Sequence, residues 1–286
     1  MTPSPLGIAR QTKHRLAERL RHARLARTRA RLRAHSLAHE PAWDPTLSPH
    51  HFVNRDPQVA PESWLGVEVP RRIFVCWTGD NPLTPNRERA LASLRAVAEV
   101  PVEVVSPATL DAWIVPGAPV HEAYEHLSLV HRSDYLRAYL MHHHGGGYSD
   151  LKPARHSWLP AFDAMDETPD AMMLGYPEVD GLAVAASPEP LGRELRQHHT
   201  HLPGMCAFIA RPGTPLSTMW WDEVTRTLDH HLPELRAHPG GVWGDDPLYP
   251  LEWFGILGTI VQPLAFRFHD HVLLRDGLTP QLTDYR

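Results

Sequence analysis

The amino-acid sequence predicts an α/β fold, in which a Rossmann-like mixed sheet is flanked by helices. Three consecutive segments support this prediction: the apolar run RRIFVCW at 71–77, the segment NRERALASLRAVAE at 86–99, and the run VEVVS at 102–106. The two apolar runs are rich in β-branched residues, as buried parallel strands are, and the segment between them has apolar residues at helical spacing. A strand, a helix and a strand in this order form a βαβ unit, with which a doubly wound sheet begins.

The chain of 286 residues divides by composition into three parts. Residues 1–42 predict a basic helical arm, because residues 10–39 contain no proline or glycine and are rich in alanine, leucine and arginine. Residues 43–69 are rich in proline and lack periodicity, which predicts a linker or an irregular segment wrapped around the body. Residues 70–286 are expected to form the main domain.

The N-terminal part carries a charge opposite to that of the rest. Residues 1–43 contain ten lysines and arginines and two glutamates, a net charge of +8, so the total of −5 leaves −13 for the remaining residues. A solvated helix docked loosely on the acidic body is one interpretation. An anchor on an anionic membrane surface through residues 10–39 is a second. Nucleic-acid binding is disfavoured, because no base-reading motif or aromatic platform accompanies the charge.

The location expected from the sequence is the cytoplasm, with a peripheral position at the inner face of the membrane as the alternative that the basic arm suggests. Both cysteines, Cys76 and Cys206, lie in apolar runs and are expected to be buried and reduced. No apolar stretch approaches the roughly 20 residues of a membrane span, and the N-terminus lacks the apolar core of a signal peptide.

Residues 133–153, SDYLRAYLMHHHGGGYSDLKP, hold the candidate functional site. Ser133 is a plausible N-cap of a buried helix, and the three glycines at 145–147 are expected to end it. Asp134 and Arg137 lie one turn apart and share a helix face. A strand is expected to follow, with Asp150 at its carboxyl end, where α/β sheets bind ligands.

The sequence gives less support to other functions of this segment. Neither GxxxxGK[ST] nor GxGxxG is present, and the glycines close a helix instead of opening one, which argues against a phosphate-binding loop. The run His142–His144 lacks the carboxylate spacing of a metal site. On spacing alone, a ligand site and a surface ion pair beside a turn aspartate remain equally open.

The segment SDYLRAYLMHHHGGGYSDLK resembles the S-D-x-x-R and G-G-x-Y-x-D-x-D motifs of the glycosyltransferase sugar-binding region that contains the DXD motif. That family includes mannosyltransferase and capsular-polysaccharide-synthesis enzymes, and the catalytic domains of bacterial glucosylating toxins look similar. The segment VPRRIFVCWTGDNPLTP resembles the family's first strand, which ends in a tryptophan, and GMCAFIARPGTPL resembles its later strand and turn. The resemblance covers about residues 70–220.

The resemblance implies a GT-A fold and the transfer of a sugar from a nucleotide donor, a UDP- or GDP-sugar, to an acceptor hydroxyl with retention, using Mn²⁺ or Mg²⁺. By matching position, Trp77 would lie against the base. Asp134 and Arg137 would hold hydroxyls of the sugar and ribose, or the diphosphate. Tyr148 would lie beside the nucleotide, and Asp150 would be the first acid of the metal motif.

The second acid of the motif is replaced by Lys152, which cannot ligate a cation. A metal would then need Asp150, the diphosphate, water and another residue, for which His269 or His271 occupies a suitable place near the C-terminus. Alternatively, the Lys152 ammonium itself neutralises the leaving phosphate. A third possibility, that Lys152 points away from the site, is disfavoured because residues two apart in a strand share a face.

The acceptor side is assigned to the loop GGVWGDDPLYP at 240–250, whose acids and prolines are unlike a core segment. Asp246 is the candidate acid there, with Asp245 as its alternative, and either is also a candidate metal ligand. The sequence therefore predicts a retaining hexosyltransferase whose acceptor is unknown. The alternatives are a non-catalytic sugar-nucleotide-binding protein, in which Lys152 abolishes turnover, and a scaffold recruited through its basic arm.

Overall fold

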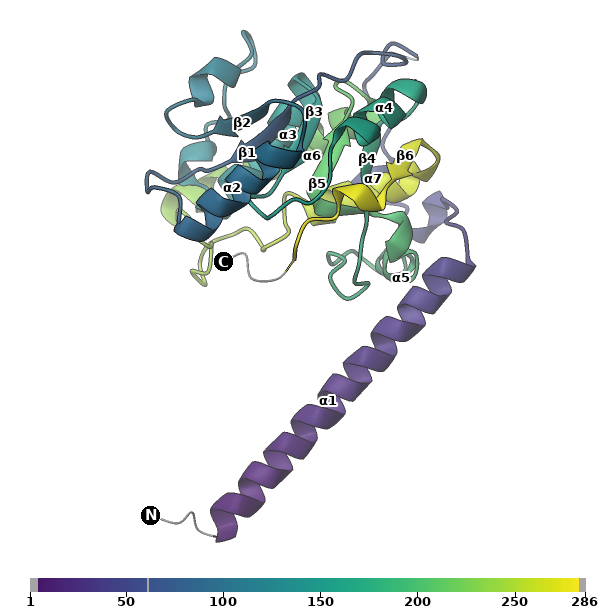
Figure 1. Ribbon diagram of the computed structural model, residues 1–286, viewed down its shortest axis with the longest axis vertical. Helices are drawn as coiled ribbons and strands as arrows, with labels where there is room; N and C mark the ends of the chain where they lie inside the picture. The colour runs from purple at the N-terminus through teal and green to yellow at the C-terminus, as the bar shows by residue number, and fades with distance from the viewer. Residues whose placement is uncertain (1–4, 61, 283–286) are drawn as a thin grey trace.

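The structure is a computed structural model that describes residues 5–60 and 62–282. Its centre is a six-stranded sheet in the order β2-β1-β3-β5-β4-β6 (Figure 1). β5 runs antiparallel to its neighbours β3 and β4, and the other pairs are parallel. The predicted α/β fold with a mixed sheet is therefore confirmed. The strands are β1 (Ile73–Cys76), β2 (Val102–Val105), β3 (Gly146–Ser149), β4 (Met173–Pro177), β5 (Pro203–Ala210) and β6 (Val272–Leu274).

Helices cover both faces of the sheet. On one face, α2 (Pro85–Val97) and α4 (Leu159–Glu167) pack on Ile73, Val75 and Ile209. On the other, α3 (Leu129–His143), α5 (Leu191–Gln197), α6 (Pro215–Ala237) and α7 (Gly258–Arg267) pack on Phe74, Tyr148 and Phe208. This alternation along each strand follows from the two-residue period of side chains in β structure. Short 3₁₀ helices are η1 (Pro45–Leu47), η2 (Phe52–Asn54), η3 (Leu110–Trp113), η4 (Tyr124–His126), η5 (His199–His201), η6 (His269–His271) and η7 (Asp276–Leu278).

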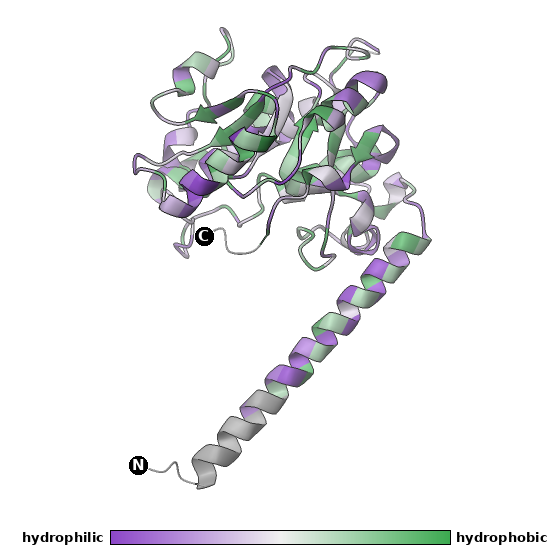
Figure 2. Ribbon diagram, in the orientation of Figure 1, coloured by the Kyte–Doolittle hydropathy of each residue, from purple (hydrophilic) through white to green (hydrophobic). Residues whose placement is uncertain are grey.

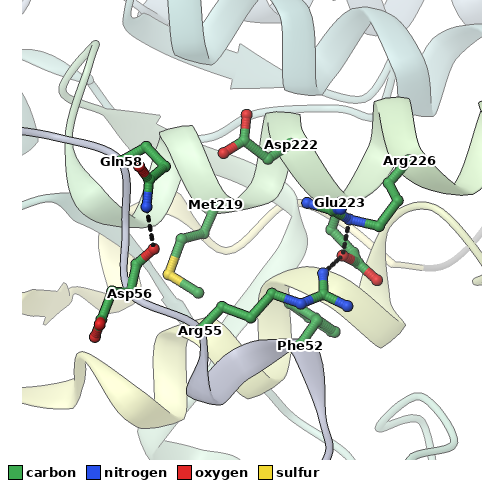
Figure 3. Close-up of a pocket in the computed structure, with 8 residues that line it drawn as sticks. All are labelled: Phe52, Arg55, Asp56, Gln58, Met219, Asp222, Glu223 and Arg226. Carbon is green, nitrogen blue, oxygen red and sulfur yellow. Dashed lines mark hydrogen bonds and ion pairs between the residues drawn. The ribbon is translucent and has the colours of Figure 1, made fainter.

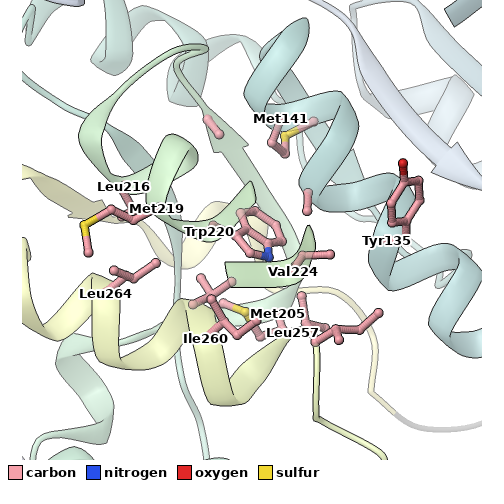
Figure 4. Packing of buried hydrophobic residues seen from close by; sticks show 14 of the residues in the cluster. Tyr135, Met141, Met205, Leu216, Met219, Trp220, Val224, Leu257, Ile260 and Leu264 are labelled. Carbon is pink, nitrogen blue, oxygen red and sulfur yellow. The ribbon is translucent and has the colours of Figure 1, made fainter. Parts of the chain in front are cut away.

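The core beneath α3, α6 and α7 surrounds Trp220, which is fully buried (Figure 4). Val224, one turn later on α6, faces Ile260 of α7 across the same cluster. Figure 2 shows the strands as the most hydrophobic part of the body. The segment 250–257 forms turns, and the buried helix α7 follows it.

The helix α3 begins five residues earlier than the sequence suggested. Its N-cap is Ser128, whose hydroxyl accepts a hydrogen bond from the backbone N–H of His131, and not Ser133. Ser133 lies inside the helix, where its hydroxyl is 3.3 Å from that of Tyr148. The hydrogen bond from the backbone N–H of Ser128 to the Tyr249 hydroxyl comes from a distant loop that no local pattern reveals.

The glycine run serves both the end of α3 and the strand after it. Gly145 has a φ of +65° directly after the helix, and a Cβ there would lie 2.5 Å from the Pro212 ring. Gly147 lies within β3, where a Cβ would come within 2.9 Å of the Trp158 ring. The run therefore ends the helix and lets β3 lie under α4.

Residues 43–69 pack against the body instead of spanning open solvent. Phe52 and Val53 are buried in the core beneath α7, and the guanidinium of Arg267 donates hydrogen bonds to the backbone oxygens of Val53 and Arg55. These contacts fit an irregular, wrapped segment. The boundaries of the three predicted parts of the chain remain a prediction.

The N-terminal helix α1 (Pro5–Ala38) contacts the body through its C-terminal part and projects away from it (Figure 1). Arg29 pairs with Asp180 at 2.7 Å, and the Ser36 hydroxyl lies 2.6 Å from that of Thr200. Asp180 follows β4 and Thr200 precedes β5, so both contacts lie at the edge where the parallel strands end. None of the helices in the described part of the chain has the length and apolarity needed to cross a bilayer.

Replacing the N-cap residue tests the beginning of α3. We expect Ser128→Ala to lower the free energy of unfolding by about 1–2 kcal/mol, because a buried capping hydrogen bond is lost. Ser133→Ala is the matched control and should cost clearly less, since Ser133 caps nothing. Chemical denaturation of both variants measures the difference, and equal losses would contradict the assignment.

Candidate functional site

A cluster of four charged side chains, of which Asp150 is partly exposed and the other three are buried, lies at the sheet edge where β3 ends. Asp134 and Arg137 come from neighbouring turns of α3, and Asp150 and Lys152 come from the bend that follows β3. Asp134, Arg137 and Lys152 are each less than one-tenth exposed. The structure therefore brings together the four charged residues that the sequence proposed for this segment.

Arg137 connects the helix to the strand. Its guanidinium donates to Asp150 Oδ1 at 3.0 Å and to the backbone oxygen of Met205 at 3.0 Å, and it lies 3.4 Å from Asp134 Oδ1. The guanidinium carbon stands 4.4 Å from the centre of the Tyr148 ring, in cation–π geometry. The Tyr148 hydroxyl donates to Asp150 Oδ1 at 3.0 Å. Two donors thus fix one oxygen of the Asp150 carboxylate.

Lys152 fixes the other oxygen. The backbone N–H of Lys152 donates to the Asp150 carbonyl at 2.7 Å, and this tight bend returns the side chain toward the end of β3. Its ammonium donates to Asp150 Oδ2 at 2.9 Å and to Cys206 Sγ at 2.7 Å. The side chain lies inside the site, as the sequence favoured, although the bend and not continued strand pairing directs it there.

The two carboxyl groups have different ionisation properties. Burial raises the pKa of Asp134 to about 6, Arg137 opposes that rise, and the nearby Asp150 adds to it. Burial also acts on Asp150, but Arg137 and Lys152 hold the pKa of that carboxyl below its ordinary value. At neutral pH the centre of the cluster is an ionised Asp150 between two cations.

Three further residues surround the charged cluster. The sequence did not indicate them as part of the site. Cys76, at the end of β1, faces Asp134, Arg137 and Asp150, and burial raises the pKa of its thiol to about 12. Cys206 of β5 lies opposite Asp150, whose backbone N–H donates to the Cys206 carbonyl at 2.7 Å. Tyr176, at the end of β4, is buried beside Cys206. The pairing of β5 with β3 places Cys206 here, and no local sequence signal encodes that pairing.

One buried donor of the cluster lacks a partner. Nε of Arg137 is buried and has no hydrogen-bond acceptor among the described residues. Buried polar atoms without a partner are uncommon, and one beside a charged site is a natural contact for a ligand oxygen.

Trp77 lies at the same sheet edge but on the other face. β1 is parallel to β3, with Phe74 paired to Tyr148, so Trp77 and Asp150 both follow the ends of neighbouring strands. The Trp77 indole N–H donates to the Asn81 carbonyl at 2.6 Å, and its ring packs with the apolar cluster under α2 and α4. The structure therefore places Trp77 near the cluster without a direct contact to Asp150.

The loop 240–257 covers the beginning of α3. The backbone oxygen of Gly241 accepts from the Leu129 N–H at 3.1 Å, and the Tyr249 hydroxyl lies 3.0 Å from His131 Nδ1. Asp246 is exposed, and its carboxylate accepts from the Leu248 N–H at 2.8 Å, which stabilises a turn of this loop. The structure does not bring Asp246 into the charged cluster.

The same loop exposes an aromatic pair that the sequence analysis did not select. Trp243 and Trp253 are about half exposed, and their rings stack 6.2 Å apart at 26°. Val242, Leu248 and Phe254 extend the exposed apolar surface. The pair lies on the loop that holds the N-terminal end of α3, two turns from Asp134 and Arg137.

His269 and His271 lie at the opposite edge of the sheet. They precede β6, which is parallel to β4, whereas Asp150 follows β3. His271 Nδ1 is 3.0 Å from the Asp170 carbonyl, and His269 Nδ1 is 3.1 Å from the Phe266 carbonyl. The structure does not bring either histidine to Asp150.

The donor set around Asp150 does not fit the divalent cation that the resemblance implies. A hard cation such as Mg²⁺ or Mn²⁺ requires free oxygen ligands. Arg137 and Tyr148 already occupy one Asp150 oxygen, and the Lys152 ammonium occupies the other. No group of three or more potential ligands from His, Cys, Asp and Glu gathers within the described residues.

A separate cavity of about 400 Å³ lies between the wrapped segment and α6 (Figure 3). An ion pair between Arg55 and Glu223 crosses it, and Arg226 lies 3.3 Å from the same glutamate. These pairs join the wrapped segment to α6, and the cavity shares no residue with the charged cluster. Its lining comprises Phe52, Arg55, Asp56, Gln58, Met219, Asp222, Glu223 and Arg226.

The raised pKa of Asp134 predicts a specific pH dependence. Between pH 4 and 6 the folded protein holds a proton on Asp134 that the unfolded chain has released, so the stability that this group contributes falls as the pH rises. We compare the free energy of unfolding of Asp134→Asn with that of the wild type. The difference in favour of the variant should grow by up to about 3 kcal/mol as the pH rises from 4 to 7. Denaturant unfolding at several pH values measures this gain, and a difference that does not change with pH would contradict it.

Comparison of the chain with protein-family models finds no match, and comparison with curated proteins finds none either.

Proposed function

We propose that the protein is a retaining glycosyltransferase with a GT-A fold, which transfers a sugar from a nucleoside-diphosphate donor to an acceptor hydroxyl. The observation that carries this proposal is the buried cluster of Asp134, Arg137 and Asp150 at the carboxyl edge of the sheet. α/β sheets bind ligands at this edge, and these residues are those by which the segment resembles glycosyltransferases.

The chemistry of the cluster suits a donor of this kind. Arg137 offers a guanidinium whose Nε is buried without a partner, and a phosphate oxygen would accept from it. Asp134 and Asp150 offer carboxylates that accept hydrogen bonds from sugar hydroxyls. Trp77 follows β1 at the same edge and is the proposed neighbour of the base.

In the proposed reaction the bond between the anomeric carbon and the diphosphate oxygen breaks, and a bond forms to the acceptor oxygen on the same face. The acceptor proton passes to the departing phosphate, so the products are the glycoside and the protonated nucleoside diphosphate. This route needs no dedicated general base. The cations of the cluster would stabilise the charge that collects on the leaving group.

The acceptor is proposed to approach beside the loop 240–257. This loop is held against the beginning of α3 and exposes the stacked pair Trp243 and Trp253. Asp246 contributes by shaping the loop, through its hydrogen bond to Leu248.

A sugar-nucleotide-binding protein without turnover is the second candidate, and the contact of Lys152 with Asp150 favours it. If that contact left Asp150 unable to act, the protein would bind a donor and release neither sugar nor diphosphate. Incubation with a bound donor and analysis of the free diphosphate distinguishes the two functions.

The basic helix α1 is proposed to associate with an anionic surface at the inner face of the membrane. The arginines between Arg19 and Arg27 are exposed, and the helix projects from the edge that holds the charged cluster (Figure 1). Clusters of arginine attract anionic lipids by about 1 kcal/mol for each charge near the surface. Such binding would bring the site toward that surface.

Nucleotide binding is the first test of the proposed function. We expect one of UDP, GDP, CDP or their sugars to raise the melting temperature, with a stabilisation of about 2.7 kcal/mol at a ligand concentration of 100 times Kd. Arg137→Gln should abolish that increase at the same concentration, and Arg89→Gln is the control because Arg89 is exposed on α2. The absence of any shift with the whole panel would reject the proposal.

Vesicle binding tests the role of α1. Substitution of Arg19, Arg21 and Arg24 by Gln should weaken binding to vesicles with anionic lipid by about a hundredfold at low salt, since three charges are lost. A control variant with Gln at the exposed positions Arg89, Arg95 and Arg193 has the same net charge. Cosedimentation at two salt concentrations measures both variants, and equal weakening would exclude a specific role of the helix.

A further inference from the structure

We propose that Lys152 takes the place of a divalent cation in this site, so that the protein binds its nucleoside diphosphate and neutralises the leaving phosphate without a metal. This inference rests on the proposed function and specifies the means by which the donor is held. The positive charge that a metal would supply comes from the Lys152 ammonium group.

Both oxygens of the Asp150 carboxylate already have hydrogen-bond donors. Its two oxygens accept hydrogen bonds from three groups: Arg137 and Tyr148 bind Oδ1, and Lys152 binds Oδ2 at 2.9 Å. A metal bound to this carboxylate would have to displace the ammonium from its closest contact. The ammonium thus stands where a cation bound to Asp150 would stand.

The Lys152 side chain is held in place by its contacts. It is only 8% exposed, unlike a surface lysine that moves freely in solvent. Cys206 Sγ lies 2.7 Å from the ammonium on the side of β5, and Glu178 at the end of β4 lies close enough to influence it electrostatically. Contacts with Asp150 after β3 and with Cys206 of β5 therefore hold one buried positive charge, and Glu178 after β4 adds a nearby negative charge.

The cation beside Asp150 is a lysine, which is rare in this chain. The chain contains 26 arginines and two lysines, Lys13 and Lys152. An ammonium is a compact point charge, whereas a guanidinium is a wide planar group that binds through a fork. Almost all basic residues of the chain are arginines, but the buried cation beside Asp150 is the compact one, a point charge that can approach a single phosphate oxygen.

A donor would meet two cations beside Asp150. The Arg137 guanidinium and the Lys152 ammonium contact different oxygens of this carboxylate, and the Asp134 carboxyl lies 3.4 Å from the guanidinium. A diphosphate entering beside Asp150 would find both cations within reach. The leaving group could then be stabilised by side chains alone.

The test uses the full-length protein and measures the Kd of UDP and GDP by calorimetry, in EDTA and in Mn²⁺. For the wild type we expect the Kd of the nucleotide that binds to agree within about twofold in the two media, since the charge of Lys152 is always present. Lys152→Met should weaken binding by about 10- to 100-fold in both media, because a hydrogen bond to a charged group is lost.

Lys152→Asp provides the decisive variant, because it restores a second carboxylate. It should bind the nucleotide poorly in EDTA and recover by at least about tenfold in Mn²⁺, as a cation replaces the lost ammonium. Lys13→Asp makes the same charge change in the N-terminal helix and should behave as the wild type. Circular dichroism shows whether each variant is folded. The comparison of wild-type binding in EDTA and in Mn²⁺ does not depend on any variant.

Three outcomes would overturn the inference. The wild type would bind its nucleotide only in Mn²⁺, or Lys152→Met would bind as tightly as the wild type, or a folded Lys152→Asp would gain nothing from Mn²⁺. Wild-type binding that depends on Mn²⁺ would leave the proposed function standing and reject only the role of Lys152. If the wild type binds no nucleotide in either medium, the proposed function fails and this inference fails with it.

Discussion

The charge on Asp150, held at the end of a buried strand, is the constraint on which the rest of the site depends. A carboxylate removed from water is tolerated only if it is paired and hydrogen-bonded. Arg137 satisfies one oxygen from α3 and Lys152 satisfies the other from the bend after β3, so helix, strand and bend must meet at one point. Loss of either partner would leave one oxygen of Asp150 without its charged donor, so the two cations and the packing of α3 form one unit.

The charged cluster and the basic helix share one edge of the molecule. α1 is attached beside Asp180 and Thr200, which border the ends of β4 and the beginning of β5. The aromatic pair Trp243 and Trp253 lies on the loop that covers α3 near the same edge. Charge, aromatic surface and the projecting helix are therefore gathered where α/β sheets place their ligands.

The sequence predicted the α/β class because the apolar runs and the helical spacing between them are local signals, and β1, α2 and β2 follow them closely. It also brought together Asp134, Arg137 and Asp150, whose spacing is fixed by one helix turn and one strand end. It placed the N-cap of α3 wrongly at Ser133 instead of Ser128, since Tyr249, which supports Ser128, is 121 residues away. The position of Cys206 opposite Asp150 and the position of His271 at the opposite edge depend on strand order. Only long-range packing decides that order.

The antiparallel direction of β5 has a consequence for how the site can change. Because β5 enters the sheet where its neighbours leave it, the carbonyls of Met205 and Cys206 contact Arg137 and the backbone of Asp150 directly. Main-chain oxygens are the same whatever residue supplies them. Substitutions along this strand would therefore alter the side chains around the charged cluster but keep these two acceptors, whereas a single inserted or deleted residue would shift both and disconnect α3 from β3.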